Sequence, residues 1–131
     1  MSMAPRVETI DEDVNAAATA ATEATVLGRA PFAGTITAVR YSPEGTITGV
    51  NTNTRRVRLF NRGQDGNGNV AVADLQFNSG TNADDFDERT IPITGSAVVA
   101  EGDVLEWRSE AVGTGLADPG GKVAVDVSRT G

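Results

Sequence analysis

Apolar and polar residues alternate along most of this chain from Val26 onwards. In GDVLEWRSE, residues 102–110, Leu105 and Trp107 fall on one side of an extended chain and the charged residues fall mainly on the other. In GKVAVDVSR, residues 121–129, three valines alternate with other residues in the same way. A period of two is typical of antiparallel strands that bury one face. The pattern predicts about eight strands, at residues 25–30, 33–41, 45–50, 55–61, 70–78, 88–94, 103–110 and 122–129.

The predicted strands are short and are separated by Gly, Asn, Asp and Pro, and no stretch after residue 25 has helical spacing. Residues 25–131 match the roughly 100-residue size of a two-sheet sandwich or jelly roll. We therefore expect an all-β fold, an antiparallel β-sandwich of jelly-roll type. Its expected core residues are Leu59, Leu75, Phe77, Leu105, Trp107, Val123 and Val125.

The first 24 residues differ in composition, because they are rich in Ala, Thr and acidic residues and show no apolar stripe. Thr9 or Asp11 is a suitable N-cap for a short helix through the alanine run, although a helix with only an alanine face is marginal alone. We expect residues 1–24 to form an N-terminal arm, either disordered or ordered on a partner, beside a β domain of residues 25–131. The candidate partner contacts in this arm are Met3, Pro5, Arg6, Val7, Ile10 and Val14.

Composition narrows the classes of function. Eleven Lys plus Arg against eighteen Asp plus Glu give a net charge of -7, which disfavours binding to nucleic acid and to anionic membranes. The chain has no His and no Cys, so it lacks the usual general base near neutral pH and any thiolate metal ligand. No other residues assemble into a recognisable catalytic constellation. We expect a soluble protein that is not an enzyme, has no cofactor, and binds neither nucleic acid nor membrane.

One stretch invites a metal interpretation. In NRGQDGNGNV, residues 61–70, Asp65, Asn67 and Asn69 have the spacing of the first three ligands of an EF-hand loop. Val70 occupies the position that needs glycine, and Gln76 occupies the position that needs a bidentate glutamate. The three residues are therefore weak metal candidates, and we interpret residues 62–69 as a glycine-rich hairpin connection.

Two further sets of residues are candidates for protein contacts. The one basic spot on this acidic chain is either a solvated strand face or a docking patch for an acidic partner, and consists of Arg55, Arg56, Arg58 and Arg62. Alternation places other apolar side chains on the outer faces, where a symmetric oligomer would cover them. These oligomer-contact candidates are Phe60, Val70 and Val72. The acidic loop at residues 84–88 is expected to be solvated, with Phe86 tucked into the core.

Three successive stretches between residues 31 and 129 carry a resemblance: PFAGTITAVRYSP, ITGVNTNTRRVRLFNRGQDGNGNVAVADLQF and VAEGDVLEWRSEAVGTGLADPGGKVAVDVSR. Their signature pieces are Asn61–Gly66, Gly102–Leu105 and Gly115–Gly121. This succession resembles a group of small virion proteins of tailed phages that infect actinobacteria.

The resemblance implies a minor capsid protein, a decoration or cement protein on the outer surface of the virion head. Such proteins are similar to one another in being β-sandwiches or barrels, often homotrimers, with an N-terminal arm that grips the major capsid protein. The arm of this chain matches no motif of the group. The alternative is a β-sandwich binding module, such as a head fibre or carbohydrate-binding domain, although no feature of the sequence supports a bound glycan. That alternative needs an exposed aromatic platform, for which Tyr41 is the more open candidate and Trp107 the less open.

Overall fold

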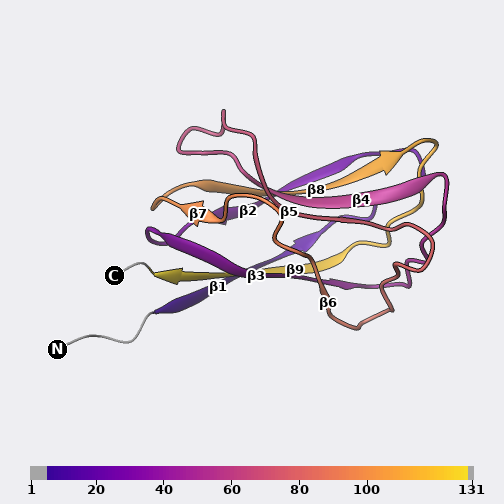
Figure 1. Cartoon of the computed structure of the whole chain (residues 1–131), viewed down its shortest axis with the longest axis horizontal. Helices are drawn as coiled ribbons and strands as arrows, with labels where there is room; N and C mark the ends of the chain where they lie inside the picture. Colours follow the sequence, from indigo (N-terminus) through magenta and orange to yellow (C-terminus); the bar gives the residue numbers. More distant parts are fainter. Residues whose placement is uncertain (1–5, 130–131) are drawn as a thin grey trace.

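The computed structural model describes residues 6–129, which form nine β-strands and no helix (Figure 1). The strands are β1 (Val7–Val14), β2 (Glu23–Arg29), β3 (Gly34–Pro43), β4 (Thr54–Asn61), β5 (Val70–Gln76), β6 (Arg89–Thr90), β7 (Val98–Val99), β8 (Val104–Val112) and β9 (Gly121–Arg129). A helix with the length and apolarity to cross a membrane is therefore absent from the described part of the chain.

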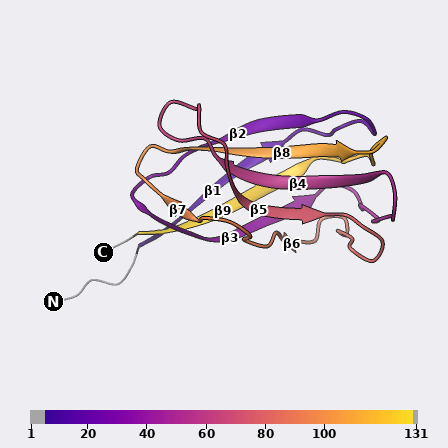
Figure 2. The same cartoon turned by 45° about the horizontal axis from the view of Figure 1, so that its top comes forward.

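The strands form two antiparallel sheets that face each other, as Figures 1 and 2 show. The first sheet has the order β1-β9-β3-β6, with β7 also paired to β3, and the second has the order β2-β8-β4-β5. Most connections carry the chain from one sheet to the other, whereas β4 and β5 are neighbours in one sheet and form a hairpin. The predicted antiparallel β-sandwich is confirmed.

Alternate side chains of both sheets fill the space between them. The ring of Trp107 is buried in this core, and its centroid lies 5.3 Å from that of the Tyr41 ring, with an angle of 52° between the two planes. Tyr41 is fully buried, so the expectation that it is the more open aromatic residue is wrong. Leu75 is only partly buried, at the edge of the core. The other expected core residues are confirmed, namely Leu59, Phe77, Leu105, Trp107, Val123 and Val125.

Residues 7–14 belong to the sandwich and not to a separate arm. β1 pairs with β9 along its whole length, from Val7 opposite Ser128 to Val14 opposite Gly121. Val14 is buried and Ile10 packs against the core. The expected helix is not formed, and the boundary after residue 24 falls inside β2. The backbone of β9 supplies hydrogen-bonding partners for this polar segment, and these partners cannot be recognised from the segment's own side chains.

Residues 45–50 do not form the expected strand. The segment contributes one isolated bridge, between Ile47 and Ala83. The N–H of Gly49 donates to the side chain of Asn82 at 2.8 Å and not to a strand, and a Cβ at Gly49 would lie 1.9 Å from the carbonyl oxygen of Asn78. The chain is held against a loop and not against a strand.

The segment from β6 to β7 closes one side of the sandwich. The N–H of Ile91 donates to the carbonyl of Val39 in the first sheet at 2.8 Å. Two residues later, Ile93 forms a bridge with Ala73 of β5 in the second sheet. This segment therefore covers one open side of the core between β3 and β5.

Candidate functional site

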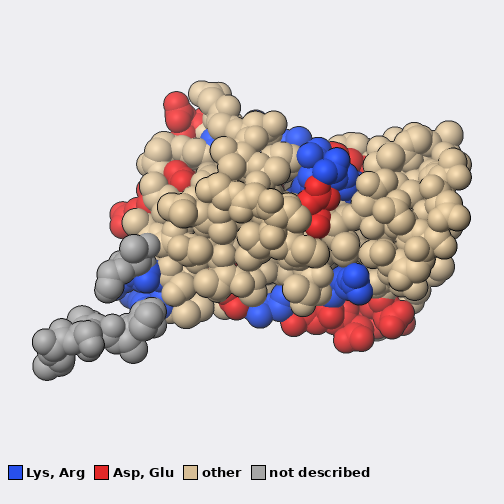
Figure 3. Space-filling view, in the orientation of Figure 1, with Lys and Arg blue, Asp and Glu red and all other residues tan. Residues whose placement is uncertain are grey.

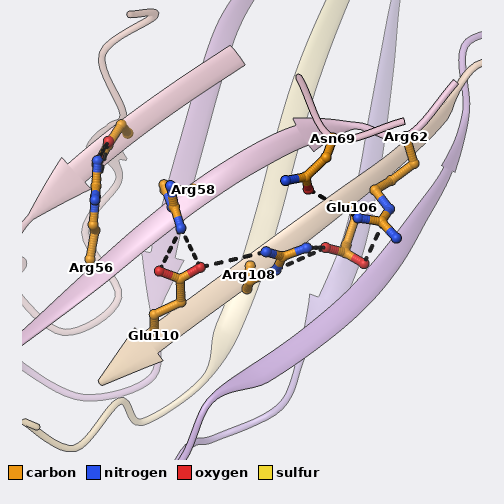
Figure 4. A network of polar contacts seen from close by, with 8 residues as sticks. Arg56, Arg58, Arg62, Asn69, Glu106, Arg108 and Glu110 are labelled. Carbon is orange, nitrogen blue, oxygen red and sulfur yellow. Dashed lines mark hydrogen bonds and ion pairs between the residues drawn. The ribbon is translucent and has the colours of Figure 1, made fainter. Parts of the chain in front are cut away.

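The outer face of the four-stranded sheet carries a ladder of ion pairs, shown in Figure 4. Arg58 of β4 donates to both carboxylate oxygens of Glu110 of β8, at 2.6 and 2.7 Å. Arg108 lies 3.7 Å from Glu110 and 2.5 Å from Glu106, and Arg62 lies 4.0 Å from Glu106. The side chains form one row because Arg58 and Arg108 are directly opposite each other in the register of β4 and β8.

This ladder covers the ring of Phe60. The guanidinium carbons of Arg58 and Arg108 lie 4.7 and 4.2 Å from the ring centroid, within the range of a cation–π interaction. Phe60 is only 2% exposed as a result. The expectation that Phe60 is an exposed oligomer contact is wrong, because the two arginines occupy the position of the expected partner.

The other two oligomer-contact candidates differ from each other. Val70 is 48% exposed and is free to contact a partner. Val72 is fully buried in the core, so its assignment is wrong. The register of β4 and β5 shifts between Leu59 and Phe60, which breaks the alternation that placed Val72 outside. The N–H groups of Thr94 and Gly95 also donate to the carbonyl of Val72, so another segment covers it.

The structure brings three of the four residues of the expected basic patch together, namely Arg56, Arg58 and Arg62. Arg56 donates to both carboxylate oxygens of Asp74, and this hydrogen bonding raises the pKa of Arg56. Each arginine on this face, Arg108 included, lies within 4.0 Å of a carboxylate. The face is therefore a row of paired charges and offers little uncompensated positive charge to an acidic partner.

Arg55, the fourth residue, points into the sandwich and is fully buried. Its assignment to a docking patch is wrong, because it shares the inward face of β4 with Val57 and Leu59. Burial lowers the pKa of Arg55, while the charge of Asp118 acts in the opposite direction. The guanidinium donates hydrogen bonds of 2.7 to 3.2 Å to the backbone carbonyls of Leu116, Ala21, Ala18 and Thr19.

Asp118 is the acidic counterpart of Arg55 in the same buried region. Its carboxylate accepts hydrogen bonds from Tyr41 at 2.5 Å, from Ser109 at 2.6 Å and from the N–H of Gly120 at 3.0 Å. Burial, followed by the charge of Asp118, raises the pKa of Tyr41, so the phenol stays protonated as a donor. The backbone of Asp118 also exchanges two hydrogen bonds of 2.9 Å with Ala17. Arg55 and Asp118 thus hold two loops against each other.

These loops form part of a surface that we call the uncharged end. It consists of residues 15–22, 45–53, 77–83 and 113–117, which contain no Asp, Glu, Lys or Arg. Its exposed side chains are mostly Ala, Thr, Asn and Ser. Figure 3 shows one end of the molecule as a broad tan area with red atoms along its lower edge. In a chain with 22% charged residues, an end without charge stands apart from the rest of the described surface.

The loops of the uncharged end are fixed to one another. The N–H of Thr114 donates to the side chain of Asn53 at 3.0 Å, which joins the third connection of the chain to the last. At Gly115, whose φ is +89°, a Cβ would lie 1.7 Å from the carbonyl oxygen of Thr19. Only glycine permits this approach of loop 113–117 to loop 15–22. The surface is therefore preorganised by backbone packing and by the buried Arg55.

At the opposite end, hydrogen bonds connect two of the signature pieces, Asn61–Gly66 and Gly102–Leu105. The carboxylate of Asp103 accepts hydrogen bonds from the side chains of Asn61 at 2.9 Å and Gln64 at 2.6 Å, and from the N–H of Ala100 at 2.9 Å. Burial acts to raise the pKa of Asp103, but these three hydrogen bonds outweigh it and lower the pKa. These two signature pieces thus maintain the fold at this end.

The metal candidates lie in the loop between β4 and β5, and the hairpin interpretation of that loop is confirmed. Asp65 and Asn67 are exposed, while the side-chain oxygen of Asn69 accepts a hydrogen bond from Arg62 at 3.0 Å. The N–H of Gly68 donates to the carbonyl of Arg62 at 2.7 Å and closes the loop. Within residues 6–129, no group of three or more Asp or Glu side chains is arranged to hold a metal ion, and the surface has no pocket.

The expected contacts of the N-terminal arm have different positions. Met3 and Pro5 lie outside the described residues. Ile10 and Val14 pack on the core and are wrong as partner anchors. Val7 is 55% exposed, and Arg6 forms an exposed ion pair with Glu8.

The acidic loop at residues 84–88 lies beside the uncharged end. Phe86 is 78% exposed, so the expectation that it is tucked into the core is wrong. Its φ of +58° is the only positive φ at a non-glycine residue in the described chain, a conformation that costs roughly 1–3 kcal/mol. The N–H of Phe86 donates to the carbonyl of Pro43 at 2.8 Å, which fixes the backbone with the ring turned outward.

Comparisons with family models, with curated proteins and with solved structures return no match.

The sequence pattern alone does not identify Arg55 and Asp118 as the residues that organise the uncharged end. The sequence does contain a signal for Arg55, however, because alternate residues of a strand share a face and Arg55 alternates with the buried Val57 and Leu59. Asp118 carries no comparable signal, because it lies in a loop.

Proposed function

We propose that this chain is a structural protein of a phage virion, which binds the outer surface of the capsid and stabilises it. The observation that carries the proposal is the pairing of the strands. Each strand from the first half of the chain pairs with its counterpart from the second half: β1 with β9, β2 with β8, β3 with β6 and β7, and β4 with β5. This is the pairing of one long hairpin rolled into two sheets, and we infer a jelly roll from it.

Jelly rolls are common in viral capsid proteins, so this inference supports the function that the sequence resemblance implies. Fold alone does not select a function, however, because jelly rolls also occur in lectins. The surface that binds the partner therefore has to distinguish a capsid protein from a lectin.

The uncharged end is the surface that we assign to the capsid contact. Charged residues are depleted at the centre of protein–protein interfaces, and this end has none. The rest of the chain carries the net charge of -7, which repels other acidic surfaces. Because Arg55 and the packed glycines hold its loops in place, binding orders few additional groups.

Binding of many copies would stabilise the shell by linkage. A protein that binds the assembled capsid, and not its dissociated subunits, shifts the equilibrium toward assembly. Copies that each contact two or more capsid subunits combine modest individual contacts into firm attachment. The homotrimer implied by the resemblance stays a prediction, and Val70 is the one candidate oligomer contact that is exposed.

Co-sedimentation of the purified chain with capsids that lack it tests the proposal. We expect saturable binding and a higher capsid melting temperature. The variant Ala20→Glu/Thr52→Glu places two charges on exposed positions of the uncharged end and should weaken binding at least tenfold. The matched control Asn67→Glu/Ser96→Glu changes exposed positions of the opposite end and should bind like wild type. Absence of wild-type binding to these capsids contradicts the proposal.

The second candidate function is a carbohydrate-binding module. The observation that favours it is the exposed Thr and Asn side chains of the uncharged end, whose hydroxyl and amide groups suit hydrogen bonding to sugars. Saturable binding to host cell-wall polysaccharide, together with no binding to capsids, would select this alternative.

A further inference from the structure

Phe86 has the most exposed side chain among the large apolar residues of the described chain. The other three phenylalanines are buried: Phe32, Phe60 and Phe77 are 5%, 2% and 0% exposed. An isolated exposed apolar residue is normal on a protein surface. Phe86 differs because its backbone is held in a conformation that is unfavourable for this residue.

Three sets of hydrogen bonds hold the loop in that conformation. The N–H of Phe86 donates to the carbonyl of Pro43 at the end of β3. The backbones of Ala83 and Ile47 exchange two hydrogen bonds, of 2.8 and 2.9 Å. The hydroxyl of Thr46 lies 3.3 Å from the carboxylate of Asp85, to which it donates, and accepts from the N–H of Asp85. The ring therefore projects from a fixed frame, which lowers the entropy that is lost when it binds.

The surroundings of Phe86 indicate the chemistry of its partner. Asp84, Asp85, Asp87 and Glu88 are all exposed around it. Glu88 lies 3.6 Å from Arg40, whereas no ion pair within the described residues involves the three aspartates. An apolar ring surrounded by uncompensated negative charge fits an apolar pocket with Lys or Arg around its rim.

We propose that Phe86 is the anchor residue of the capsid contact, and that its ring enters an apolar pocket rimmed by Lys or Arg on the capsid protein. This inference rests on the proposed function and assigns the partner's chemistry at the edge of the uncharged end. Buried aromatic anchors supply a large share of the binding energy of many interfaces, while charges at the rim guide association.

A second copy of this chain is a less suitable partner. The arginines on the outer face of β4 and β8 are only partly exposed and are already paired with Asp74, Glu106 and Glu110. The one aromatic residue of that face, Phe60, is covered by Arg58 and Arg108. A membrane fits no better, because the acidic loop is repelled by anionic lipid.

Phe86→Asn separates binding from folding. Asn tolerates positive φ much better than Phe, so this variant should keep or raise the melting temperature of the chain while it removes the ring. The control Val98→Ala trims another exposed apolar side chain, on β7, which pairs with the beginning of β3 at the opposite end from Pro43. Asp84→Asn/Asp87→Asn removes two charges of the rim.

Binding of these variants to capsids that lack the protein is measured by co-sedimentation at several salt concentrations. We expect Phe86→Asn to bind at least tenfold more weakly, Val98→Ala to bind like wild type, and the rim variant to show weaker dependence on salt. Wild-type affinity of Phe86→Asn for the capsid overturns this inference and leaves the proposed function intact. Light scattering that shows loss of self-association in Phe86→Asn, with capsid binding unchanged, overturns it in favour of a second copy. Absence of wild-type capsid binding overturns both.

Discussion

The hydroxyl group of Tyr41 donates a hydrogen bond to the carboxylate of Asp118 over 2.5 Å in the interior of the sandwich. Tyr41 lies on β3 in one sheet, and Asp118 lies in the loop that leads from β8 in the other sheet to β9. Ser109 of β8 donates to the second oxygen of the same carboxylate. The carboxylate therefore connects the two sheets directly beneath the uncharged end, and its donors determine how firmly that end is held.

Tyr41→Phe keeps the aromatic ring and removes one donor to the buried carboxylate. We expect the free energy of unfolding at pH 7 to fall by about 1–3 kcal/mol, the cost of an unsatisfied buried polar group. The raised pKa of Tyr41 adds a second signature. A phenol whose pKa is higher in the folded state stabilises the fold below the unfolded pKa of about 10, and this stabilisation is lost as the pH rises further. Denaturant titrations at pH 7 and above pH 10 measure both effects, and equal loss of stability at high pH in wild type and variant would contradict the second.

Arg55→Lys tests whether the buried guanidinium organises the loops of the uncharged end. One ammonium group cannot replace the planar guanidinium, whose donors bind four backbone carbonyls of residues 18, 19, 21 and 116. We expect a loss of about 3 kcal/mol or more in the free energy of unfolding, measured in denaturant, because buried carbonyls lose their partners. Arg56→Lys, on the neighbouring outward position, is the control and should cost less than about 1 kcal/mol. Equal costs for the two variants would show that Arg55 has no special role.

Asp103→Asn tests the cluster at the opposite end. The pKa of Asp103 is lowered in the folded state from its ordinary value of 3.8. A carboxyl group with a lowered pKa stabilises the fold above its unfolded pKa, and this stabilisation is lost as the pH falls through the folded pKa. We expect the stability of wild type to decrease below about pH 4, and the difference between wild type and Asp103→Asn to shrink over the same range. Unfolding free energies between pH 2 and 7 measure this, and a constant difference would contradict it.

Asp65→Ala tests the calcium interpretation of the loop between β4 and β5. Asp65 is exposed, and no second carboxylate of the described residues joins it in a metal-binding group. We expect the melting temperature to be the same in wild type and variant, with calcium and with EDTA. A wild-type melting temperature that rises with calcium, together with a variant that does not respond, would restore the metal assignment.

Strand alternation predicted the strands with buried apolar faces, such as β8 and β9, because their core contacts are encoded in their own residues. It placed Phe60 on the outer face but could not predict that the ring is covered, since the two arginines that cover it come from two strands and meet only in the folded sheet. The sequence does not predict the outward position of Phe86 for a related reason. A large apolar residue is expected inside, and its outward position depends on a hydrogen bond to Pro43, which lies 43 positions earlier in the chain.

The position of the N-terminal segment cannot be predicted from the sequence, because the sequence shows its side chains but not its backbone partners. β1 contains four acidic residues and has only Ile10 and Val14 in contact with the core. Its order arises from pairing with β9, across more than 100 positions of sequence. Long-range backbone pairing of this kind leaves little signal in a polar strand.

Deletion of residues 2–14 decides whether this segment is an arm or a strand. Without β1, the edge of β9 loses its pairing partner along eight positions, and the core loses the contacts of Ile10 and Val14. Full burial of an aliphatic side chain contributes about 1.5–3 kcal/mol, and Val14 is buried whereas Ile10 is half-buried, so we expect the free energy of unfolding to fall by at least about 2 kcal/mol. Thermal melting and the hydrogen exchange of the β9 amides measure the loss.

Asp13→Ser, a change at a strongly exposed position of the same strand, is the control and should melt like wild type. An independent arm would give the opposite result, with wild-type melting temperature and wild-type exchange in the truncated chain. That outcome would return residues 7–14 to the role of a capsid-binding arm, whereas loss of stability places them in the sandwich that presents the uncharged end.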